Sequence, residues 1–65
     1  MRKWKVVVVA SIDDGIREYG ESFEKHVTTE RNTRWLAERI AIADVMLEHD
    51  GCFVRIDDVK TWSEG

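Results

Sequence analysis

Few residues in this sequence have side chains that bind metals or act as nucleophiles. The strongest ligands for a soft metal are His26, His49 and Cys52, and His49-x-x-Cys52 has the spacing of half a zinc site. A structural zinc site needs four ligands, and the other half is missing. A histidine at a helix end beside a small buried cysteine explains the same residues without a metal. We therefore expect no metal site and no cofactor.

Carboxylates are more numerous, and several are adjacent or close in sequence. The acidic residues of interest are Asp13, Asp14, Glu18, Glu21, Glu24, Asp57 and Asp58. Two convergent carboxylates can bind Mg²⁺ or act as an acid and a base, but this spacing is also typical of turns and of charged edge strands. The sequence contains no serine or cysteine nucleophile in a recognisable motif and no Gly-rich phosphate loop. We therefore predict that the protein is not an enzyme.

Length and composition indicate one small folded domain, residues 1–65. The chain has 43% hydrophobic and 35% charged residues, which is too apolar for a disordered protein and near the lower size limit for one core. Cys52 is the only cysteine, so no intramolecular disulfide forms, and a reducing, cytoplasmic setting is expected. The apolar run Val6–Ala10 is too short to span a membrane, and no membrane association is expected.

Glycine residues divide the chain into four expected elements. Asp14-Gly15 is typical of a tight hairpin turn, which predicts strands at about 4–12 and 16–25. Thr28 or Thr29 is expected to cap a helix that runs to about His49 and ends at Gly51. A third strand is expected at 52–59.

The order of these elements predicts the topology. After the helix returns along the hairpin, the third strand must run antiparallel to the first, and it most simply pairs beside it. We therefore expect an α+β fold of ββαβ type, with a three-stranded antiparallel sheet in the order second, first, third and one long helix on one face. The β-branched run Val6–Val9 then lies in the central strand, where such residues are favoured.

The helix is expected to bury its apolar stripe against one face of this sheet. That stripe comprises Leu36, Ile40, Ala43 and Leu47, widened by Trp35, Ile42 and Met46. A two-residue turn places Val6 opposite Phe23 and Trp4 opposite Lys25, on the face that meets the helix. A three-residue turn would slip the register by one residue and expose Trp4 and Val6 instead.

The other sheet face has no helix to cover it. With the two-residue turn it holds Val7, Val9 and Phe53, and an exposed apolar patch usually marks an association site. The simpler alternative is that these side chains are tolerated singly in water. The candidate binding residues are Val7, Val9, Phe53, Arg55, Trp62, Asp13, Asp14, Glu18, Glu21 and Glu24.

These features predict a non-catalytic protein-binding module. In element order alone, the chain is similar to small ββαβ proteins that bacteriophages encode to bind and inhibit host machines such as RNA polymerase or defence nucleases. The resemblance implies an inhibitor of a host nucleic-acid-processing or defence protein. The acidic hairpin would occupy a basic channel on that partner.

Two other classes of function remain open. A homodimer could bury the open sheet face or extend the sheet at an edge strand. A nucleic-acid-binding protein could use the basic N-terminus, with Trp4 stacking on a base between Lys3 and Lys5, and a helix patch of Arg31, Arg34 and Arg39. The net charge of -3 argues against nucleic acid as the partner.

Overall fold

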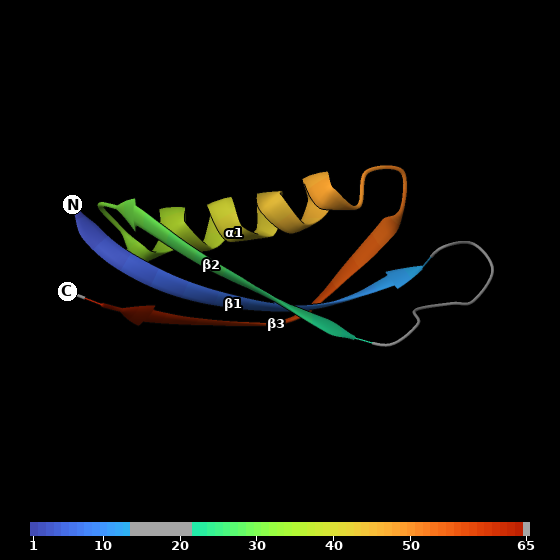
Figure 1. Cartoon of the computed structure of the whole chain (residues 1–65), viewed down its shortest axis with the longest axis horizontal. Helices are drawn as coiled ribbons and strands as arrows, with labels where there is room; N and C mark the ends of the chain where they lie inside the picture. Colours follow the sequence, from blue (N-terminus) through green and yellow to red (C-terminus); the bar gives the residue numbers. More distant parts are fainter. Residues whose placement is uncertain (14–21, 65) are drawn as a thin grey trace.

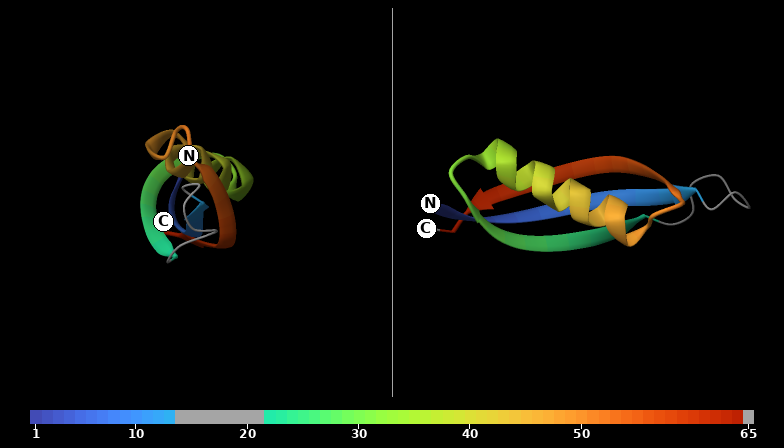
Figure 2. Two further views of the ribbon diagram at one scale, coloured as in Figure 1. Left: turned by 90° about the vertical axis from the view of Figure 1, so that its right-hand side faces the viewer. Right: turned by 90° about the horizontal axis from the view of Figure 1, so that it is seen from above.

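The computed structural model describes residues 1–13 and 22–64, which form three strands and one helix. In chain order these are β1 (Arg2–Asp13), β2 (Phe23–Arg31), α1 (Arg34–Glu48) and β3 (Phe53–Ser63). The strands form one antiparallel sheet in the order β2-β1-β3. Helix α1 lies on one face of this sheet, and the described chain places no second helix on the other face (Figures 1 and 2). The predicted ββαβ fold and strand order are confirmed.

Strand β1 lies in the centre of the sheet because its sequence suits burial on both sides. Val6, Val8 and Ala10 are fully buried beneath α1, and Trp4 is buried with them except for 9% of its surface. A β-branched run packs well on a pleated surface that has neighbours at both edges. The core is therefore built mainly on the even-numbered residues of β1.

The predicted register of the hairpin is wrong by four residues. Val6 lies opposite Val27, and Trp4 lies opposite Thr29. Strand β2 thus begins at Phe23, and the predicted turn at Asp14-Gly15 lies outside the described residues. An even shift leaves every side chain of β1 on its predicted face, because side chains alternate with a period of two.

Helix α1 begins later than predicted. The hydroxyl of Thr33 caps it by accepting a hydrogen bond from the Leu36 backbone N–H at 3.3 Å. Thr28 and Thr29, the predicted caps, continue β2 instead, as β-branched residues readily do. The predicted end is confirmed, because Gly51 follows the helix with a φ of 88°.

The helix also presents a different face to the sheet from the predicted one. Its buried residues are Ala37, Ala41 and Val45, at successive intervals of four. The sheet already supplies large side chains, including Trp4 and the valines of β1. Small residues on α1 let the helix approach this layer closely and fill it without voids. The predicted inward stripe of Leu36, Ile40, Ala43 and Leu47 is therefore wrong.

Two polar contacts join β2 to its neighbours. The Lys25 ammonium lies 2.5 Å from the Glu48 carboxylate, and this hydrogen bond raises the pKa of Lys25. The Trp4 indole N–H donates to the backbone oxygen of Arg31 at 3.2 Å, which gives this buried ring its polar partner. The hydroxyl of Thr61, in contrast, is buried without a hydrogen-bond partner in the described chain.

Candidate protein-binding surfaces

The most apolar surface of the described chain lies on the side of α1 that faces away from the sheet. We call it the outer helix face and define it by Trp35, Leu36, Met46 and Leu47. Their exposed fractions are 63%, 39%, 47% and 75%. Together these side chains leave on the order of 400 Å² in water, which falls in the range of the largest apolar patches of monomeric proteins.

Charged side chains accompany the outer helix face. The Arg39 guanidinium lies over the Trp35 ring, 5.2 Å from its centroid, in a cation–π contact. Arg34 and Glu38 form an i, i+4 ion pair at 3.7 Å on the same helix, as their spacing predicts. Large apolar side chains around an arginine, flanked by an ion pair, are a usual composition of a protein-binding surface.

Sequence reasoning missed this surface because α1 is apolar on both sides. The interval-of-four series Ala37, Ala41 and Val45 was as visible as the series of larger residues. The signal that could have identified the buried face is side-chain volume. Trp4, Val6 and Val8 already provide bulk on the sheet, so a close-packed layer needs small residues facing them.

The open sheet face is less apolar than predicted. Val7 is only 7% exposed and Val9 is half-buried, so the prediction that both are exposed is wrong for Val7. Phe53 and Trp62 are 77% and 49% exposed, but they lie at opposite ends of β3. The eight residues of extended strand between them hold them about 30 Å apart. This face therefore presents two isolated aromatic side chains.

Polar neighbours surround the central valines on this face. Val7 lies between His26 of β2 and Lys60 of β3, and Val9 lies between Glu24 and Asp58. Long polar side chains can cover apolar surface with their stems while their charged ends stay in water. Glu24 pairs with Val9 and lies on the open sheet face.

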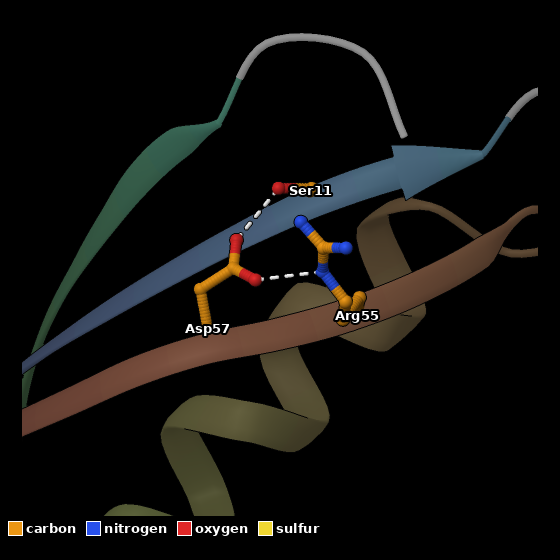
Figure 3. Close-up of polar contacts among 3 residues, drawn as sticks. All are labelled: Ser11, Arg55 and Asp57. Carbon is orange, nitrogen blue, oxygen red and sulfur yellow. Dashed lines mark hydrogen bonds and ion pairs between the residues drawn. The ribbon is translucent and has the colours of Figure 1, made fainter. Parts of the chain in front are cut away.

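Three residues form a polar cluster at one end of the open face (Figure 3). Asp57 accepts a hydrogen bond from the buried Ser11 hydroxyl at 2.6 Å and another from Arg55 Nε at 2.7 Å. The Ser11 hydrogen bond is the main cause of the lowered pKa of Asp57. The register changes between Val9 and Ala10, which makes Asp57 the extra residue of a β-bulge. Arg55 pairs with Ser11 and Asp57 bonds to it, so both lie on the open sheet face.

The acidic residues predicted for binding are only partly described. Asp14, Glu18 and Glu21 lie outside the described residues. Asp13 ends β1, where its backbone pairs with Phe53. Glu24 is exposed, and its carboxylate lies 3.2 Å from His26 Nε2.

Two of the residues considered for metal binding, His49 and Cys52, lie in the turn after α1, where the Cys52 backbone N–H donates to the His49 carbonyl oxygen at 3.1 Å. The His49 ring packs against Phe23, with 5.0 Å between ring centroids. Cys52 is exposed in the turn before β3, so the predictions that it is buried and begins that strand are wrong. Residues 1–13 and 22–64 contain no group of three metal-binding side chains and no pocket.

The aromatic residue predicted to stack on a base is not available to do so. Trp4 is buried in the core, where its N–H is also engaged. Trp62 is half exposed on the open face instead, directly opposite Lys5 and two residues from Lys60. No ion pair engages either lysine in the described chain. The predicted basic N-terminal clamp therefore loses its tryptophan, and Trp62 provides a different one.

Similarity to known proteins gives no further assignment. No family model, curated protein or solved structure matches the chain. Within the described residues, no helix has the length and apolar character needed to cross a membrane. Inference about function therefore rests on the chemistry of the chain's own surfaces.

Proposed function

We propose that this protein is a non-catalytic protein-binding module and that the outer helix face is its main contact surface. The single observation that carries this proposal is the exposure of Trp35, Leu36, Met46 and Leu47 together on one helix. Burying such side chains against a partner gains roughly 25 cal/mol per Å² of apolar surface. Tryptophan is also enriched among the residues that dominate binding energy.

The class of partner follows from charge. The chain carries a net charge of -3, and several of its carboxylates lie in or near the β1–β2 connection. An acidic surface favours a basic partner, such as the nucleic-acid channel of a host nucleic-acid-processing or defence protein. We therefore retain a phage-type inhibitor as the specific form of the proposal, with Asp13, Asp14, Glu18, Glu21 and Glu24 as its electrostatic part.

The open sheet face has a smaller role in this proposal than sequence patterns predicted. Val7→Glu is not a clean surface variant, because Val7 is 7% exposed and a charge there would also destabilise the fold. Leu47→Glu and Phe53→Glu are the better pair. The two residues are about equally exposed, but one lies on the outer helix face and the other on the open sheet face.

A capture experiment tests the proposal. The tagged protein is incubated with nuclease-treated bacterial lysate, and bound proteins are identified by mass spectrometry. A stoichiometric partner should be lost with Leu47→Glu and kept with Phe53→Glu. Equal capture by wild type and both variants would remove the outer helix face from the proposal. Binding that is insensitive to salt and survives Asp13→Asn with Asp14→Asn would remove its acidic part.

A second candidate function is binding of single-stranded nucleic acid by the open sheet face. It is favoured by the placement of Trp62 beside Lys5 and Lys60, because an exposed aromatic ring can stack on a base while lysines contact phosphates. Addition of oligonucleotide should then quench tryptophan fluorescence, and high salt should reverse the change. No quenching at low salt, or equal quenching with Trp62→Phe, would reject this candidate.

A further inference from the structure

The outer helix face has an internal symmetry that bears on the identity of its partner. Trp35 and Leu36 form one apolar pair, and Met46 and Leu47 form another. The two pairs are eleven residues apart, which is about 20° more than three full turns of an α-helix. They therefore lie on the same side of α1, about 16 Å apart along its axis.

This spacing fits an antiparallel copy of the same helix. A two-fold axis midway between Arg39 and Ala43 places Trp35 opposite Met46 of the other copy, and Leu36 opposite Leu47, because these residues share a flank of the helix. The same axis places Arg39 opposite Ala43, and the small alanine leaves room for the arginine stem. One sequence thus supplies both halves of the contact, which is the requirement for a two-fold interface.

The charges at the helix ends favour the antiparallel arrangement. Arg31 precedes α1 and Asp50 follows it, and both are exposed. In the antiparallel pair, Arg31 of one copy approaches Asp50 of the other at each end. The two helix dipoles also oppose each other favourably. A parallel pair would instead bring Arg39 against Arg39 and align the dipoles.

We propose that α1 is the interface of an antiparallel homodimer, formed by the outer helix face of two copies. This inference rests on the proposed protein-binding function: it assigns the outer helix face to a second copy of the chain and leaves Asp13, Asp14, Glu18, Glu21 and Glu24 as the contact for a basic partner. With on the order of 400 Å² of large apolar side chains from each copy, the contact is smaller than a stable interface and has the size of a weak, transient one. The dimer should therefore form in the micromolar range and dissociate on dilution.

Sedimentation of the purified protein over a range of concentrations tests this proposal. The wild type should show a reversible monomer–dimer equilibrium. Leu47→Glu should weaken dimerisation at least tenfold, because two carboxylates would enter an apolar contact, and Phe53→Glu should leave it unchanged. A wild type that stays monomeric at high micromolar concentration, or a dimer equally weakened by both variants, would overturn the proposal.

Disulfide trapping tests the orientation. Trp35→Cys and Met46→Cys are made separately in a Cys52→Ser background, mixed and oxidised. The antiparallel pair should give mainly the mixed disulfide, whereas a parallel pair would give disulfides between identical variants and overturn the model of the interface. If the chain is monomeric yet still captures a different protein through Leu47, the homodimer fails while the proposed binding function stands. Failure of capture and of self-association together would reject both.

Discussion

The two faces of α1 differ in side-chain size, and the larger apolar side chains lie on the face that points away from the sheet. The inner face carries Ala37, Ala41 and Val45, while the outer face carries a tryptophan, two leucines and a methionine. Both faces are apolar, so hydrophobicity does not distinguish them. The sheet distinguishes them, because its large residues leave space for small ones. The face with the larger side chains therefore remains available for binding.

The largest expected difference between the two faces comes from replacing one buried and one exposed alanine of α1 by glutamate. Ala41→Glu places a carboxylate against the core and should lower the free energy of unfolding by at least about 3 kcal/mol, enough to unfold much of a chain this small. Ala43→Glu, on the exposed side of the same helix, should change it by less than about 0.5 kcal/mol. Denaturant unfolding followed by circular dichroism measures both. Equal losses would mean that the inner and outer faces are assigned incorrectly.

Truncating an apolar side chain to alanine should lower the free energy of unfolding by less than a buried glutamate does. The loss should again be larger on the inner face than on the outer face. Val45→Ala deletes two methyl groups from a fully buried site and should cost about 2 kcal/mol of unfolding free energy. Leu47→Ala deletes more carbon but should cost less than about 0.5 kcal/mol in dilute monomer, since Leu47 is mostly exposed. Thermal unfolding at low protein concentration compares them. A larger loss for Leu47→Ala would contradict the exposed outer face.

The buried layer also contains a correctable defect. Thr61 faces the core opposite Val6, and its hydroxyl has no hydrogen-bond partner in the described chain. Thr61→Val should therefore raise the free energy of unfolding by about 1 kcal/mol, because it removes an unpaired polar atom with little change of shape. Thr28→Val on the exposed side of β2 is the control and should be nearly neutral. A destabilised Thr61→Val variant would indicate that the hydroxyl is satisfied in solution.

The smallest expected effect concerns the polar open face. The Ser11 hydroxyl stabilises the charged form of Asp57 and lowers its pKa below the usual value. Its contribution to stability should be present above the unfolded-state pKa of about 3.9 and should be lost as pH falls through the lower folded-state value. Asp57→Asn and Ser11→Ala should each reduce the fall in unfolding free energy in this acid range. An unchanged pH profile in both variants would rule out this contribution.

The sequence predicted the topology but not how deeply each side chain is buried. Period-two alternation placed Trp4, Val6 and Val8 on the core face, and the glycine after α1 marked its end. The hairpin register was wrong because Asp14-Gly15 suggested a tight turn, whereas β-branched Val27, Thr28 and Thr29 extend β2. The four-residue error was even, so the sheet faces survived it.

The candidate site was less predictable than the fold. Periodicity identified an apolar stripe on α1, but it could not show that the facing sheet leaves room only for Ala37 and Ala41. It also gave Val7 an exposed position, although neighbours on both flanking strands reduce its exposure to 7%. Both errors concern how much space neighbouring side chains fill, which depends on tertiary contacts that one sequence does not specify.

The bulge at Asp57 allows β3 to change its length by one residue. Because Asp57 is the residue without a partner on β1, its deletion would leave Asp58 opposite Val9 and Ile56 opposite Ala10 and would restore a regular ladder. Every other side chain of β3 would keep its face. Deletion of Val59 would instead turn Lys60 toward the core. In evolutionary terms, the bulge marks the place where this strand can gain or lose one residue without rebuilding the protein around it.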